Sequence, residues 1–109
     1  MARFSEEMAL HVSRSRIMEI CERAVEGVDL ILEEHEKEYM HLKEAYRFDH
    51  FNPVEIDIRI EQKNGTAILK VEGSCSGEGA LQESHVRAKV RELLSRVQID
   101  MEYGLHPIE

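Results

Sequence analysis

Apolar side chains recur at helical spacing over a long stretch in the N-terminal half of the chain. From Ile17 to Tyr46 they step by three or four residues, and the mean step matches the α-helical repeat. This pattern predicts one long helix with a continuous apolar stripe, preceded by a first helix that Ser5 caps. The stripe comprises Ile17, Cys21, Ala24, Val28, Ile31, His35, Tyr39, Leu42 and Tyr46.

The predicted helix is longer than a domain of this size is wide. The 30 residues from Ile17 to Tyr46 span about 45 Å as a helix, whereas a chain of 109 residues folds into a body about 30–35 Å across. The helix therefore either breaks near Gly27 into a helical hairpin or projects and pairs with a second copy. We favour pairing, because no proline or turn cluster accompanies Gly27.

The polar and apolar positions change to a period of two after Pro53. Residues 54–61 alternate between isoleucine or valine and charged side chains, which predicts a half-buried strand. Asn64-Gly65 is the strongest signal for a two-residue hairpin turn, so the sequence predicts a β-hairpin. The opposed pairs are Ile60–Leu69 and Ile58–Val71 on the buried side, and Arg59–Lys70 and Asp57–Glu72 on the exposed side.

A second helix and a third strand are expected after the hairpin. The helix begins at about Ala80, and its apolar stripe contains Val86, Val90, Leu93, Leu94 and Val97. From Val97 to Tyr103 apolar and polar residues alternate, which predicts a strand ending at Gly104.

The expected fold class is therefore α+β in a single domain, 1–109. A long N-terminal helix or helical hairpin (1–48), which we expect to mediate oligomerisation, precedes a ββαβ unit (53–104). The unit forms a three-stranded, mainly antiparallel sheet with the helices on one face.

Composition narrows the classes of function. The net charge of −8 argues against nucleic acid, because phosphate backbones are bound by clusters of lysine and arginine. No apolar run reaches the length of a membrane span, and the N-terminus lacks the apolar segment of a signal peptide, so we expect a cytoplasmic protein. Cys21 and Cys75 form no CxxC motif and are expected to be reduced.

One group of side chains has the composition of a metal site. Glu34, Glu38 and His41 are spaced by four and three residues, so the predicted helix would place them on one face. Two carboxylates and an imidazole can bind Mn, Fe or Zn, with a second chain supplying further ligands. The competing interpretation is a solvated helix face that carries no metal.

The loop before the second long helix offers another candidate. Gly73, Cys75, Gly77 and Gly79 precede a helix N-terminus, where free backbone amides can bind an anion or a small ligand. A complete phosphate-binding motif is absent from the sequence, so a plain strand-to-helix connection is the alternative. Cys75 with His85 as its base is a less favoured nucleophile.

These observations rank the functions. The leading hypothesis is a non-catalytic, homo-oligomeric interaction or regulatory domain assembled through the Ile17–Tyr46 helix. The alternative is a protein that binds a divalent metal or a small ligand through the acidic residues or the loop 73–79. An enzyme ranks third, because the sequence contains no recognisable catalytic set.

Overall fold

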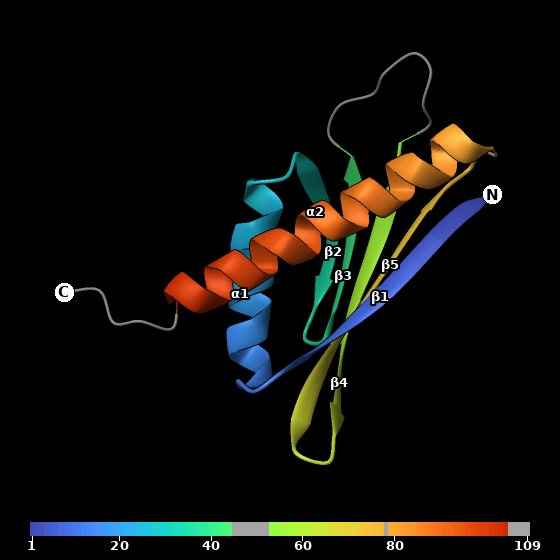
Figure 1. Ribbon diagram of the computed structural model, residues 1–109. Coiled ribbons are helices and arrows are strands. Elements are labelled where there is room, and N and C mark those ends of the chain that lie inside the picture. The colour runs from blue at the N-terminus through green and yellow to red at the C-terminus, as the bar shows by residue number, and fades with distance from the viewer. Residues whose placement is uncertain (45–52, 78, 105–109) are drawn as a thin grey trace.

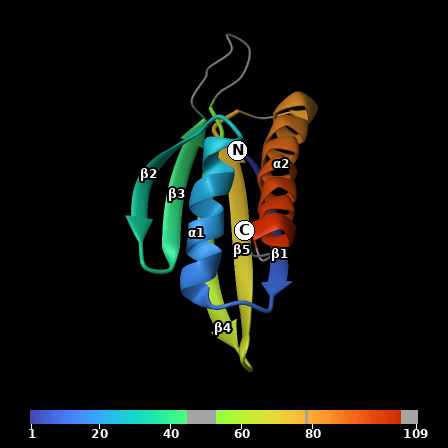
Figure 2. The same cartoon turned by 90° about the vertical axis from the view of Figure 1, so that its left-hand side faces the viewer.

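The computed structural model describes residues 1–44, 53–77 and 79–104. The strands form one antiparallel sheet in the order β1-β5-β4-β3-β2 (Figure 1). Both helices lie on the same face of this sheet (Figure 2). The elements are β1 (Ala2–Leu10), α1 (Arg14–Glu26), β2 (Leu30–Glu36), β3 (Tyr39–Glu44), β4 (Glu55–Lys63), β5 (Thr66–Cys75) and α2 (Ala80–Gly104).

The predicted fold class is wrong. Among the described residues the sheet has five strands instead of three, and a helix follows the last of them, where the ββαβ prediction ends on a strand. The error has three sources, one at each place where the predicted secondary structure differs from the observed one.

The first difference lies at the N-terminus. Ser5 caps no helix but belongs to β1, where it opposes Glu72 of β5. Ala2 and Leu10 at the two ends of β1 are buried, and the positions between them alternate between exposed and partly buried side chains. The alternation is that of a strand with one face on the core.

The second difference is the long helix: between Ile17 and Glu44, where the structure describes the chain, a short helix and two strands take its place. Helix α1 begins at the N-cap Ser13, whose hydroxyl accepts a 3.3 Å hydrogen bond from the Arg16 amide, and it ends at the C-cap Gly27. Asp29 then has a φ of 55°, in the left-handed region, and turns the chain into β2. The chain therefore does break at Gly27, but into a β-hairpin and not into a second helix.

The third difference is the C-terminal strand, which is the end of α2. The stripe of valines and leucines continues from Val97 to Met101, one helical turn further on, and Met101 packs against the core. Ile99, which the strand prediction placed inside, is 45% exposed. Neither α1 nor α2 is long and apolar enough to cross a membrane within the part of the chain that the structure describes.

The β4–β5 hairpin is confirmed together with its register. All four predicted pairs are observed, and Lys63 opposes Thr66 across the two-residue turn. Asn64 and Gly65 have φ values of 52° and 79°, as a turn of this type requires. Ile56, Ile58 and Ile60 face the helices and are buried.

Helix α2 packs closely on β5 because that strand contains a glycine at position 73. A Cβ at Gly73 would lie 2.6 Å from Val90 Cγ2 and 3.1 Å from Val86 Cγ1, so a side chain there would push α2 away. Val86, Val90 and Leu93 of α2 are fully buried in the same core. Each buried side chain of this size contributes about 1.5–3 kcal/mol.

Candidate metal site

The face of the sheet that points away from both helices, the outer face, is polar. On β3 and β4 the buried Met40, Leu42 and Ile56 alternate with side chains that point outward. His41 of β3 and Asp57 of β4 oppose each other in register on this outer face. Directly opposed side chains in a sheet lie about 5 Å apart, which is close enough to interact.

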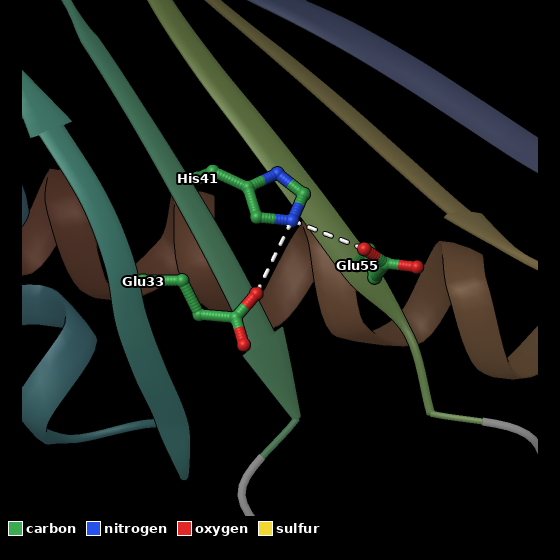
Figure 3. A group of neighbouring side chains, drawn as sticks. All are labelled: Glu33, His41 and Glu55. Atoms are coloured by element: carbon green, nitrogen blue, oxygen red, sulfur yellow. Dashed lines mark hydrogen bonds and ion pairs between the residues drawn. The ribbon is translucent and has the colours of Figure 1, made fainter.

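His41 is surrounded by three carboxylates. Its Nδ1 lies 2.7 Å from Asp57 Oδ1, and its Nε2 lies 3.0 Å from Glu55 Oε1 and 3.4 Å from Glu33 Oε1. Because the Asp57 carboxylate can only accept, Nδ1 is the donor in that bond. The contact fixes the imidazole ring with Nε2 directed toward the two glutamates, as Figure 3 shows.

A β-bulge supplies Glu33. The register of β2 against β3 shifts between Leu32 and Glu34, so Glu33 is an extra residue in β2. A bulge of this kind re-aims a side chain relative to a regular strand. One ligand atom each from Glu33, His41 and Glu55, the donor cluster, lies within 4.8 Å of the other two. Three neighbouring strands thus contribute one donor each.

Asp57 connects the donor cluster to Tyr39. The Tyr39 hydroxyl donates a 2.7 Å hydrogen bond to the same Asp57 oxygen that accepts from His41. The guanidinium carbon of Arg59 lies 4.7 Å from the centre of the Tyr39 ring, a cation–π contact. The arrangement holds Asp57 behind His41, on the side away from Glu33 and Glu55.

These contacts shift three pKa values. The Asp57 hydrogen bond raises the pKa of His41; partial burial opposes the increase and the Glu55 bond adds to it. Partial burial alone raises the pKa of Asp57, but the bonds from His41 and Tyr39 outweigh it and the pKa is lowered. The Asp57 bond is the main reason that the pKa of Tyr39 is raised to about 12. The surrounding carboxylates therefore favour the protonated form of His41 more than water does.

The predicted metal ligands Glu34, Glu38 and His41 are only partly brought together. Glu34 opposes His41 on β2 but is not a member of the donor cluster. Glu38 lies in the turn between β2 and β3, where its carbonyl accepts a 3.0 Å hydrogen bond from the Ile60 amide. The helical spacing that grouped the three residues does not apply, because they lie on a hairpin.

Sequence reasoning missed Glu33, Glu55 and Asp57. The last two were predicted to lie on the exposed side of a strand, but nothing linked them to His41. A signal was available: Met40 and Leu42 alternate with Tyr39, His41 and Lys43, which is a strand pattern.

The residues predicted to form a helical interface lie on several different elements, so the prediction of assembly through a long helix is wrong. Ile17, Cys21, Ala24, Val28 and Leu42 are core residues, while Ile31 is 52% exposed on β2. His35 of β2 lies 3.6 Å from Glu22 of α1, and Tyr46 lies outside the described residues. The expected homo-oligomer itself stays a prediction.

The residues of the predicted glycine-rich ligand loop have different surroundings. Gly73 belongs to β5 and contacts α2, whereas the Gly77 carbonyl accepts a 3.1 Å hydrogen bond from the Ala2 amide. Gly79 has a φ of 105° just before α2. Cys75 is 2% exposed, and its thiol donates to Gln82 Oε1 at 3.3 Å.

The nucleophile interpretation of Cys75 gains no support from its surroundings. His85 Nε2 lies 2.9 Å from Glu44 Oε2, and Glu44 Oε1 also accepts a 3.0 Å hydrogen bond from the Val54 amide. The Glu44 side chain is only 7% exposed. His85 and Glu44 thereby tie α2 to the ends of β3 and β4.

Comparisons with known proteins support the fold. No protein-family model and no curated protein matches the sequence. DynU16, from the dynemicin biosynthetic locus, aligns with a TM-score of 0.69 and 11% identity over 95% of this chain and 48% of DynU16. CalU16 from Micromonospora echinospora aligns with a TM-score of 0.61 and 7% identity over 93% of this chain and 79% of CalU16.

A third solved structure extends the comparison. Ara h 8.0201 aligns with a TM-score of 0.51 and 13% identity over 88% of this chain and 94% of that protein. The shared arrangement is a Bet v1-like fold, in which an antiparallel sheet packs against a C-terminal helix. The chain spans about half the length of DynU16 (48%). At these identities the likeness concerns the fold alone.

Proposed function

We propose that this chain is a binding protein that holds a divalent first-row transition metal through Glu33, His41 and Glu55. The observation that carries the proposal is the orientation of His41. Asp57 accepts from Nδ1, and the other ring nitrogen is directed at two carboxylate oxygens that lie 3.0 and 3.4 Å away.

The surroundings of His41 match those of histidine ligands in known metal sites. Such ligands almost always donate their second ring N–H to a carboxylate or carbonyl group, which fixes the ring and increases its basicity. Asp57 occupies this position, and Tyr39 in turn hydrogen-bonds to Asp57. The arrangement is more specific than a group of exposed acids, because one imidazole, that of His41, contacts three carboxylates.

The donor types select the metal. An imidazole with two carboxylates suits Zn²⁺, Mn²⁺ or Fe²⁺, whereas Ca²⁺ prefers six or more oxygen ligands. Three protein donors leave coordination positions for water, as in metal sites that remain open to solvent. We propose binding rather than catalysis, because Cys75 and His85 are engaged with Gln82 and Glu44.

Metal and proton compete for the same nitrogen. A metal takes Nε2 of the neutral imidazole, so loading releases a proton from His41. Because the pKa of His41 is raised, we expect affinity to increase with pH until His41 is neutral without metal.

Titration calorimetry on protein purified without an affinity tag tests the proposal. We expect Zn²⁺ and Mn²⁺ to bind at one site per chain, and His41→Ala to abolish the signal. The matched control is His35→Ala, which removes an exposed histidine from β2 outside the donor cluster. The proposal is wrong if neither metal binds the wild type, or if the two variants bind alike.

A further inference from the structure

The aromatic ring of Phe4 contacts two arginines on the opposite side of the molecule from the donor cluster. The guanidinium carbons of Arg87 and Arg91 lie 5.5 and 5.2 Å from the centre of the Phe4 ring. Phe4 belongs to β1, which forms one edge of the sheet, and it packs against the core on the side of the helices. The donor cluster spans β2, β3 and β4 on the outer face.

The close packing of α2 on β5 brings these three residues together. Phe4 opposes Gly73 in the register of β1 and β5. Because Gly73 lets Val86 and Val90 approach the sheet, the next positions of α2, Arg87 and Arg91, reach the ring of Phe4. The positions of both guanidinium groups thus follow from the backbone and from one aromatic side chain.

The charges at this place do not balance. Arg91 Nε lies 3.3 Å from Glu6 Oε1, whereas Arg87 has no ion pair with any carboxylate among the described residues. Two like charges four residues apart on a helix repel each other. In a chain with a net charge of −8, Arg87, Arg91 and Glu6 together carry one net positive charge.

We propose that Arg87 and Arg91 form a binding site for an oxyanion, a phosphate or carboxylate group of a small ligand. The planar guanidinium group donates parallel hydrogen bonds that match both kinds of group. The ring of Phe4 restricts both side chains before binding, so less rotamer entropy is lost when the anion arrives. An incoming anion also offsets the repulsion between the two arginines.

The test follows the side-chain Nε–Hε signals of the arginines in ¹⁵N-labelled protein by NMR. Sodium phosphate and sodium acetate are added in separate titrations, each at an ionic strength held constant with sodium chloride. We expect saturable shifts of the Arg87 and Arg91 signals in at least one titration. The two arms identify which oxyanion is preferred.

Three variants locate the site. Arg87→Ala should weaken binding about tenfold, equivalent to about 1.4 kcal/mol. Phe4→Leu keeps an apolar side chain and both cations but removes the ring, and should weaken binding severalfold. Arg23→Ala makes the same change in net charge on the exposed side of α1 and should leave binding unchanged. A thermal melt confirms that each variant is folded.

Two results overturn the proposal. The first is a set of shifts that do not saturate or that match those produced by sodium chloride alone. The second is an Arg87→Ala protein that binds as tightly as the Arg23→Ala protein. Because neither Arg87 nor Phe4 belongs to the donor cluster, both results leave the metal proposal untouched.

Discussion

The two hairpins of the sheet differ in how much of each strand is enclosed. Both strands of the β4–β5 hairpin are paired on two sides, and their inward side chains are buried without interruption from Ile56 to Ile60 and from Ala67 to Val71. In the β2–β3 hairpin, β2 forms the edge of the sheet and only Leu30 of that strand is buried. The hairpins therefore contribute unequally to the core.

The difference separates folding from binding. Ile56, Ile58 and Ile60 of β4 are buried in the core, so substitutions there are costly. The exposed β2 has no such constraint, and it carries Glu33 on a bulge beside His41. The donor cluster uses one residue from the β4–β5 hairpin, Glu55, and two from the β2–β3 hairpin.

The largest expected contrast compares one isoleucine from each hairpin. Ile58→Ala removes a fully buried side chain from β4 and should lower the free energy of unfolding by about 2–5 kcal/mol. Ile31→Ala acts on a side chain that is 52% exposed and should change it by less than about 0.5 kcal/mol. Urea denaturation followed by circular dichroism measures both. Equal losses would contradict the division between the hairpins.

Gly73→Ala tests the contact between the β4–β5 hairpin and α2. The new methyl group overlaps Val90 Cγ2 and should lower the free energy of unfolding by about 1–3 kcal/mol. Val90→Ala removes the overlapping group, so it should cost less in the Gly73→Ala background than in the wild type. Additive effects of the two substitutions in the double-mutant cycle would show that the contact is not the cause.

A substitution behind the donor cluster should weaken metal binding while leaving the fold intact. Asp57→Asn replaces the carboxylate that orients His41 and should lower Zn²⁺ affinity at least about tenfold. Glu61→Gln is the matched control, because Glu61 also lies on β4 but pairs with Lys70. Calorimetry that finds equal affinities for the two variants would remove Asp57 from the site.

The smallest effect concerns pH in metal-free protein. His41 has a raised pKa in the folded protein. Its contribution to the free energy of unfolding is therefore complete below the ordinary pKa of 6.5 and is lost as the pH rises through the pKa of the folded state. Asp57 has a lowered pKa in the folded protein. Its contribution to the free energy of unfolding is therefore complete above the ordinary pKa of 3.8 and is lost as the pH falls through the pKa of the folded state. The stability difference between wild type and His41→Ala should therefore peak near about pH 5–6, at less than about 1 kcal/mol.

Denaturation with EDTA present, repeated at several pH values, measures that difference. Tyr39→Phe is the comparison, because the pKa of Tyr39 is about 12 and its loss should cost the same amount from about pH 5 to pH 8. If the difference in free energy of unfolding between wild type and His41→Ala is equally independent of pH, the charge of the imidazole does not stabilise the fold.

The two hairpins also explain which parts of the fold could be predicted from the sequence. In β4 and β5 the alternation of side chains and Asn64-Gly65 give the same answer, so both the element and its register were predictable. The turn between β2 and β3 is Lys37-Glu38, which has no turn preference, and the strands around it are rich in glutamate. Their composition favours a helix, and tertiary pairing overrides that preference.

Strand β2 and its part of the site were hidden because the strand lacks the alternation of buried and exposed side chains that identifies a strand: only Leu30 is buried. The bulge, which adds Glu33 between Leu32 and Glu34, could not be predicted from such a strand either. The same bulge brings Glu33 to His41. His41 could be singled out from its residue type alone, but its partners come from the two neighbouring strands β2 and β4, and only the pairing of these strands with β3 assembles them.

The exposed edge of β2 has a consequence for solubility. A free strand edge is a template on which another chain can add a strand, the first step of many aggregation reactions. Here the edge carries Glu33, Glu34 and Glu36, and the bulge interrupts its regular row of amides and carbonyls. Acidification or a bound cation reduces the charge of this edge but leaves the bulge in place, so the geometric obstacle to stacking remains when the electrostatic one is weakened.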